Sequence, residues 1–216
     1  MTSTRRENSI GGVVLCGGHS RRMGRPKATL PFGPEVMLQR VARILSEAVG
    51  PVVVVSARGQ SVPDLSDNVQ VVTDEYESHG PLAGIATGLG ALRNEVEFAF
   101  VTSCDVPLLK PAFVTEMVRR LGNCDVAVPN DGQYDHVLSG VYRTKLEDQA
   151  RQLLAADRRR PVFLLDDSSS LRVPVEELRA VDPQLDSLKN TNTPEEYAEA
   201  LKAAGFNVQP YSPDDA

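Results

Sequence analysis

Short apolar, β-branched runs that recur along the chain constrain its fold most strongly. Five such runs alternate with segments of helical periodicity, and they cover residues 11–15, 52–55, 69–73, 98–102 and 125–128. Continuous apolar runs of this length are typical of strands buried on both faces of a mostly parallel sheet. Helical segments between such strands make βαβ units with right-handed crossovers. We therefore predict an α/β fold whose ligand lies at the carboxyl ends of the strands.

Helical spacing of apolar residues predicts helices over residues 35–49, 82–92 and 111–121. The pattern changes from residue 129, where we expect a strand at 137–142, a helix at 145–154 and a polar turn or mobile loop at 166–170. Thr193 as N-cap, followed by Pro194 and by Glu196 at N3, predicts one more helix. We expect a single domain over 9–205, with an N-terminal half (9–128), a C-terminal half (129–205) and a flexible tail (206–216).

Charge and composition narrow the class of protein. The 216-residue chain is 41% hydrophobic and carries a net charge of -6, which argues against a general nucleic-acid binder. The chain shows no signal peptide and no membrane-spanning run, so we expect a cytoplasmic protein. Cys16, Cys104 and Cys124 have no CxxC spacing, and the spacing of the three histidines does not suggest a metal cluster.

A glycine-rich, basic segment, LCGGHSRRMGRPK, follows the first predicted strand at residues 15–27. Gly17 and Gly18 allow a ligand to approach the main chain, whose N–H groups can bind a phosphate. Lys27 and the arginines supply positive charge; the arginines are Arg21, Arg22 and Arg25. The segment matches neither GxxxxGK[ST] nor GxGxxG. A flexible basic surface loop is the alternative, but the charge density favours a phosphate site.

Four motifs in order carry a resemblance to a known family: LCGGHSRRMGRPKATL, GPLAGIATGL, TSCDVPLL and NTNTPEEY. Together they resemble small-molecule nucleotidyltransferases and, among these, the molybdenum cofactor guanylyltransferases of the MobA family. The resemblance implies a three-layer αβα, Rossmann-like nucleotidyltransferase fold. It also implies transfer of GMP from GTP to the phosphate of molybdenum-bound molybdopterin, which yields molybdopterin guanine dinucleotide and pyrophosphate.

The resemblance implies roles for individual residues. The expected nucleotide-binding residues are Leu15, Cys16, Gly17, Gly18, Lys27, Ser56, Asp74, Gly80, Gly84 and Asp105. Lys27, Asp105 and Arg22 are the expected catalytic residues, and Asp105 is the expected Mg²⁺ ligand, as suits a carboxylate at the end of a strand. Asp74 can accept hydrogen bonds from guanine, although it could face the metal instead. Gly80 and Gly84 could serve helix packing, and Cys16 could be an inert packing residue.

The expected acceptor-binding residues are Asn190, Asn192, His136 and Arg159. Asn190 and Asn192 stand two apart, so on an extended strand their amides share one face, although both could serve turn and cap chemistry. Arg159 belongs to an Arg-Arg-Arg run that could simply be solvated. His136 precedes Val137 where the family has proline.

The implied reaction needs no side-chain nucleophile, because the acceptor phosphate that attacks the α-phosphorus of GTP is already anionic. Alternatives are a cytidylyltransferase, a sugar-phosphate nucleotidyltransferase, and a catalytically silent carrier that binds GTP or pterin. We expect a monomer with GTP and molybdopterin as ligands, transient contact with molybdoenzymes or cofactor-biosynthesis proteins, and no nucleic-acid or membrane partner.

Overall fold

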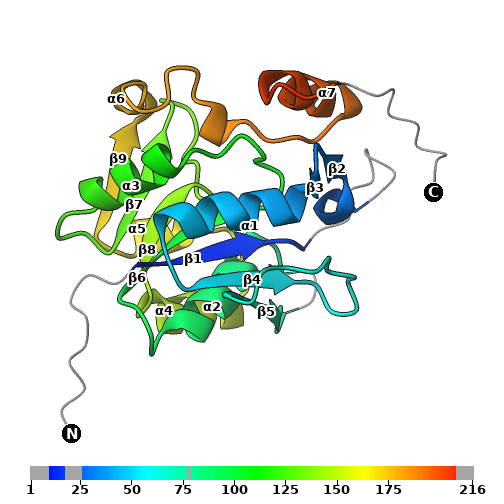
Figure 1. Ribbon diagram of the computed structural model, residues 1–216. Helices are drawn as coiled ribbons and strands as arrows, with labels where there is room; N and C mark the ends of the chain where they lie inside the picture. The colour runs from blue at the N-terminus through cyan, green and yellow to red at the C-terminus, as the bar shows by residue number, and fades with distance from the viewer. Residues whose placement is uncertain (1–9, 18–25, 77–78, 208–216) are drawn as a thin grey trace, which may run out of the picture.

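A computed structural model describes residues 10–17, 26–76 and 79–207 of the chain. Seven strands form one sheet in the order β5-β4-β1-β6-β8-β7-β9 (Figure 1). They are β1 (Ile10–Leu15), β4 (Val52–Ser56), β5 (Val69–Thr73), β6 (Phe98–Ser103), β7 (Val126–Asn130), β8 (Gly140–Arg143) and β9 (Ser170–Pro174). Neighbouring strands are parallel except at β8, which runs antiparallel to β6 and β7. The predicted mostly parallel sheet is confirmed.

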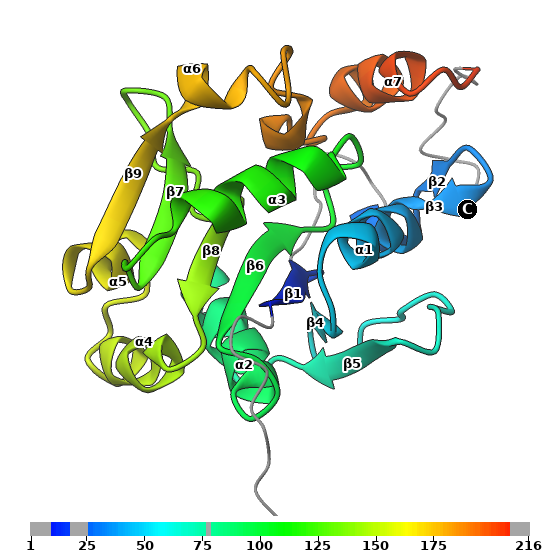
Figure 2. The ribbon, with the colours of Figure 1, turned by 60° about the vertical axis from the view of Figure 1, so that its left-hand side comes forward.

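Helices cover both faces of the sheet, which makes three layers (Figure 2). Val14 of β1 points to the side of α1 (Met37–Ala48) and α3 (Pro111–Arg120), where one apolar core lies. Val13 and Leu15 point to the side of α2 (Pro81–Leu92), α4 (Leu146–Ala155) and α5 (Val162–Asp166), where a second core lies. The alternation along β1 is the period of a strand buried on both faces.

A smaller third core joins a hairpin at residues 31–36 to the last described helix. It packs α7 (Pro194–Ala203) on the hairpin of β2 (Pro31–Phe32) and β3 (Glu35–Val36) through Phe32 and Leu201. The predicted capping box of α7 is confirmed, because Glu196 N donates to Thr193 Oγ1 at 3.2 Å and Thr193 N donates to Glu196 Oε2 at 3.1 Å. This cap fixes where the chain turns from residue 192 into the helix.

Some expectations about individual elements were wrong. β5 is one of the two edge strands of the described sheet, and Val71 is 45% exposed, so β5 is not buried on both faces. Residues 35–36 form β3, so the first helix begins only at Met37. Of the predicted strand at 137–142, only residues from Gly140 pair with a neighbour.

Several short elements were not predicted at all. They are the 3-10 helices η1 (Lys27–Thr29) and η2 (Asp186–Leu188), β2, α5, β9 and α6 (Val175–Leu178). Residues 166–170 do make a turn, which joins the end of α5 to the start of β9. Within the described ranges, no helix combines the length and the apolar character needed to cross a membrane.

Candidate functional site

The carboxyl ends of four neighbouring strands bring most of the expected nucleotide-binding residues to one edge of the sheet. Backbone bonds extend the ladders past the strand ends: Cys16 N donates to Val55 O at 2.8 Å, and Asp74 N donates to Ser56 O at 2.7 Å. On the other side of β1, Cys104 N donates to Leu15 O at 2.9 Å. Residues that follow β1, β4, β5 and β6 therefore lie in one row, as expected for a parallel sheet.

Lys27 is the centre of a polar group at this edge. Its Nζ donates to Asp105 Oδ2 at 2.8 Å and to Asn192 Oδ1 at 2.6 Å. The other carboxylate oxygen of Asp105 accepts a hydrogen bond from the Ser103 hydroxyl. The side chains of Lys27 and Asp105 are 17% and 15% exposed, so the ion pair is largely removed from water without being closed off. Asn192, an expected acceptor-binding residue, thus contacts Lys27, which in turn contacts Asp105.

Thr191 also attaches to this group. Its backbone amide and its hydroxyl both donate to the carbonyl oxygen of Asp105 at 2.8 Å. Thr191 is 1% exposed, and Asn190 next to it is exposed. The strand end at Asp105 and the segment before α7 therefore form one hydrogen-bonded unit.

Two buried thiols, those of Cys16 and Cys104, lie near Asp105. The Cys104 thiol donates to the Cys16 sulfur, and this bond lowers the pKa of Cys16 while burial opposes the change. The same bond and burial raise the pKa of Cys104 well above its ordinary value. Gln60 Nε2 donates to the Cys16 carbonyl at 2.9 Å and to its sulfur at 3.1 Å. Since Cys16 is 4% exposed, its side chain packs inside the protein.

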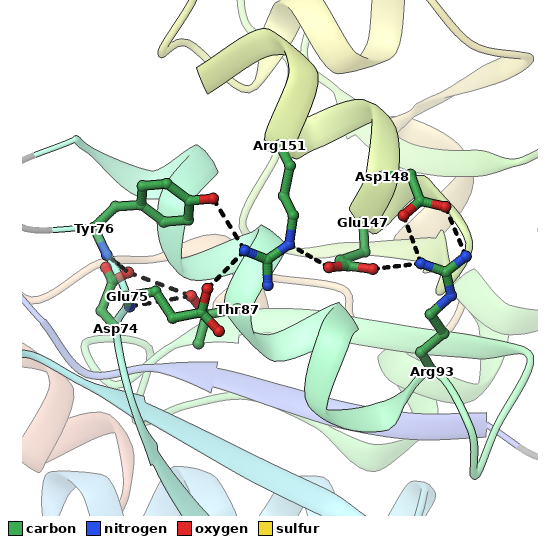
Figure 3. A network of polar contacts seen from close by, with 8 residues as sticks. All are labelled: Asp74, Glu75, Tyr76, Thr87, Arg93, Glu147, Asp148 and Arg151. Atoms are coloured by element: carbon green, nitrogen blue, oxygen red, sulfur yellow. Dashed lines mark hydrogen bonds and ion pairs between the residues drawn. The ribbon is translucent and has the colours of Figure 1, made fainter. Parts of the chain in front are cut away.

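Asp74 is half-buried after β5 and is held by the turn that follows it (Figure 3). Its Oδ1 accepts from Tyr76 N at 3.0 Å and from Thr87 Oγ1 of α2 at 3.3 Å. Ser56, buried on the neighbouring strand end, donates its hydroxyl to Val72 O at 3.4 Å. The carboxylate is thus oriented by groups of its own loop and of α2.

The two glycines expected near the nucleotide have different surroundings. Gly80 is the N-cap of α2 and has a φ of 76°, a conformation that favours glycine. A Cβ atom on Gly84 would lie 3.0 Å from Leu15 Cδ2, so its missing side chain lets α2 approach β1. Gly84 therefore has the helix-packing role that the sequence left open beside ligand contact.

The other expected acceptor residues, His136 and Arg159, each form contacts in a different part of the structure. His136 Nε2 lies 3.1 Å from Asp131 Oδ2, within the connection from β7 to β8. Arg159 Nε donates to Asp157 Oδ1 at 2.6 Å, while its carbonyl oxygen lies 3.9 Å from the Cβ position of Gly80. Neither of these contacts joins His136 or Arg159 to the Lys27 group. Gly18, Arg21, Arg22 and Arg25 lie outside the described residues.

Comparison with known proteins decides the family. The profile of the "MobA-like NTP transferase domain" matches residues 12–171, well over half of the chain. The chain belongs to the MobA-like NTP transferase family. It is a nucleotidyltransferase, and the resemblance seen in the four sequence motifs is confirmed.

Curated relatives agree with this assignment, and a solved structure shares the fold. A "Probable molybdenum cofactor guanylyltransferase" of Mycobacterium bovis is 40% identical over 169 residues, which cover 76% of this chain and 83% of the relative. A protein of the same description from Mycobacterium avium is 36% identical over 189 residues, which cover 85% and 91%. The fold resembles the crystal structure of molybdopterin-guanine dinucleotide biosynthesis protein A from Archaeoglobus fulgidus, with a TM-score of 0.73, 23% identity, and 90% and 98% of the two chains covered.

The donor set of this MobA-like nucleotidyltransferase bears on which ion it could hold. Among residues 10–17, 26–76 and 79–207, no group of three or more His, Cys, Asp or Glu side chains could enclose a metal. Asp105 offers a single hard carboxylate whose Oδ2 already faces the cation of Lys27. Mg²⁺ in phosphate-transfer sites takes one or two carboxylates and completes its shell with water and phosphate. The residues present therefore fit Mg²⁺ and do not fit a closed zinc site.

Sequence reasoning missed two members of the site. Ser103 stands two residues before Asp105 in the TSCD motif, and that spacing on a strand end could have indicated a shared face. Thr191 lies between Asn190 and Asn192, and its hydroxyl donates to the carbonyl oxygen of Asp105. No local signal indicates that contact, because it joins residues 86 positions apart.

Proposed function

We propose that this nucleotidyltransferase moves GMP from GTP to the phosphate of molybdenum-bound molybdopterin, forms molybdopterin guanine dinucleotide, and releases pyrophosphate. The observation that carries the proposal is the position of Lys27, which contacts Asp105 of the expected nucleotide site and Asn192 of the expected acceptor site. The names of the mycobacterial relatives support the choice of guanylyl transfer and of the acceptor.

The chemistry asks the protein mainly for charge neutralisation and positioning. The acceptor oxygen is anionic, so a general base is not required, and the barrier comes from bringing two negatively charged phosphates together. Lys27 is a fixed cation between the two expected subsites, and Ser103 and Thr191 hold Asp105 on either side. When bound at Asp105, Mg²⁺ supplies further positive charge to the phosphate oxygens.

Base selection is assigned to Asp74 in this proposal. A carboxylate at this place accepts hydrogen bonds from the N1–H and 2-amino groups of guanine, which cytosine and uracil do not present. Asn190, Asn192, His136 and Arg159 are assigned to the acceptor. Asn190 has the exposure that an acceptor contact needs. We also propose that the enzyme acts as a cytoplasmic monomer and meets molybdoenzymes only transiently.

The test is a pyrophosphate-release assay with molybdenum-bound molybdopterin as acceptor and Mg²⁺ present. GTP, CTP, UTP and ATP are compared at equal concentration, and EDTA is added in a parallel series. The proposal predicts turnover with GTP above the other nucleotides and loss of turnover with EDTA. A preference for CTP, turnover only with a sugar phosphate as acceptor, or nucleotide binding without pyrophosphate release would each replace it with the corresponding alternative.

A further inference from the structure

The loop that carries Asp74 follows an edge strand of the sheet. Among the described residues β5 pairs with β4 alone, and its residues Gln70 and Val71 are exposed. An edge strand fixes its following loop from one side only, so a side chain that must recognise a base there needs a second support.

Arg151 of α4 supplies contacts from outside this loop (Figure 3). Its Nη1 donates to Glu75 Oε2 at 2.6 Å and to the Tyr76 hydroxyl at 3.0 Å. Its guanidinium carbon lies 5.8 Å from the centre of the Tyr76 ring. A single side chain from far along the chain thus contacts both residues that follow Asp74.

Arg151 is itself held in place. Its Nε donates to Glu147 Oε1, one turn earlier on α4, and the other oxygen of Glu147 accepts from Arg93 Nη1 at 2.6 Å. Arg93 also makes two bonds of 2.6 Å to Asp148. The Glu147 side chain is only 10% exposed, and it packs over Gly90 of α2, where a Cβ atom would lie 3.4 Å away. The guanidinium of Arg151 therefore has one favoured position relative to α2 and the sheet.

The hydrogen bonds inside the loop connect this position to Asp74. Asp74 Oδ1 accepts from the backbone amide of Tyr76, the residue whose side chain Arg151 contacts. Thr87 of α2 bonds the same oxygen, so the carboxylate lies between two supports. The pKa of Glu75 is lowered chiefly by its hydrogen bond from Arg151, so the contact persists at neutral pH.

We infer that Arg151 is a positioning residue that holds residues 74–76 so that Asp74 meets the guanine base, and that nucleotide selectivity depends on it. The inference rests on the proposed function, in which Asp74 accepts hydrogen bonds from guanine. Arg151 touches neither phosphate nor acceptor in this account. Its contribution passes through Glu75 and Tyr76 to Asp74.

The test compares Arg151→Gln and Arg151→Lys with the wild type. Arg119→Gln is the matched control, because Arg119 lies on α3, on the opposite face of the sheet, and also makes two hydrogen bonds to a glutamate. ITP serves as the probe nucleotide, because it lacks the 2-amino group of GTP. In Arg151→Gln we expect the ratio of kcat/KM for GTP to that for ITP to fall about tenfold, mainly through KM for GTP, with kcat within about threefold.

Lysine keeps the charge but cannot contact Glu75, Tyr76 and Glu147 together as a planar guanidinium does. The GTP:ITP ratio of Arg151→Lys should therefore lie between those of Arg151→Gln and the wild type. Because Arg151 acts through Asp74, adding Arg151→Gln to Asp74→Asn should change the ratio little further. Hydrogen exchange of the amides of residues 74–76 in the nucleotide-free protein gives a readout that does not depend on turnover. We expect exchange about tenfold faster in Arg151→Gln and unchanged in Arg119→Gln.

Unchanged exchange in Arg151→Gln would overturn the positioning role. Faster exchange with an unchanged GTP:ITP ratio would overturn the selectivity role and leave the proposed function standing. A wild type that uses GTP and ITP equally would overturn the contact of Asp74 with the 2-amino group of guanine in the proposed function, and with it the selectivity assigned to Arg151.

Discussion

Thr191 donates two hydrogen bonds to one acceptor, the carbonyl oxygen of Asp105, from its backbone amide and from its side-chain hydroxyl, both at 2.8 Å. Thr191 is buried, so water does not readily replace either donor. The contact fixes the end of β6 to the segment that carries Asn190 and Asn192.

Replacing Thr191 by valine tests this contact. Valine keeps the shape and loses the hydroxyl, so we expect the free energy of unfolding in urea to fall by about 1 kcal/mol. Thr191→Ser keeps the donor and removes a methyl group, and it serves as the control. If Thr191→Val proves as stable as the wild type, the hydroxyl bond does not contribute to holding the segment.

The Lys27–Asp105 pair should be needed for turnover rather than for folding. Lys27→Met removes the cation that faces the phosphates in the proposed function, and Asp105→Asn removes the charged carboxylate that would hold Mg²⁺, so for each we expect kcat/KM to fall by about three orders of magnitude. Lys145→Met is the control, since Lys145 forms an ion pair with Asp125 away from the carboxyl ends of β1, β4, β5 and β6. Near-normal pyrophosphate release from both variants would contradict the mechanism.

Two glycines of α2 should respond differently to alanine. A Cβ atom on Gly88 would lie 2.4 Å from Val13 Cγ1 of the central strand, whereas at Gly84 the nearest atom is the end of the Leu15 side chain at 3.0 Å. We expect Gly88→Ala to lower the free energy of unfolding by about 2 kcal/mol. Gly84→Ala should cost less. A stable Gly84→Ala variant with a raised KM for GTP would add a ligand contact to its packing role.

Native alkylation should separate the three cysteines. Cys16 and Cys104 are 4% and 7% exposed, while Cys124 is only partly buried. We expect iodoacetamide to modify Cys124 first, because burial denies the reagent access to Cys16 despite its lowered pKa. Mass spectrometry of digested samples reads the order, and the urea-unfolded protein is the reference. Modification of Cys16 before Cys124 would identify a reactive thiol.

Acid should weaken the attachment of the C-terminal segment. Burial raises the pKa of Asp182, but hydrogen bonds from Lys110 and Ser187 outweigh burial and leave it below its ordinary value of 3.8. A lowered carboxyl pKa stabilises the fold fully above that ordinary value, and the contribution is lost as the pH falls below it. Acid titration of stability should therefore show a loss that begins near this pH.

Lys110→Met tests the same pair. At pH 7 it leaves the fully buried Asp182 without its cation, and we expect a loss of about 2 kcal/mol in the free energy of unfolding. The expected loss is modest because Lys110 is 37% exposed, so water partly screens its charge. The difference from the wild type should narrow toward pH 4, where Asp182 of the variant can take up a proton. A difference that stays constant from pH 7 to pH 4 would show that ionisation of Asp182 is not involved.

The features that the sequence predicted well are local ones. The capping box of Thr193 and Glu196 depends on residues three apart, and the buried runs of β1 and β4 carry their own apolar pattern. The place of β5 at the edge is different, because it depends on which distant strand pairs with which. The same holds for Thr191 on Asp105 and for Arg151 on Glu75, whose partners lie 86 and 76 positions away.

The antiparallel β8 limits how members of this family could be recombined. It pairs with β6 through Ala99 and Tyr142 and with β7 through Val126 and the same Tyr142, so residues on both sides of position 129 interleave in one sheet. Because β7 also pairs with β9, a chimera joined there would have to match three foreign strand pairings at once. One of them includes the contact at Gly140, where a Cβ atom would lie 2.7 Å from the Ala127 carbonyl oxygen. Grafts of single loops at the strand ends leave these pairings intact, and they are the route by which a new acceptor could be introduced.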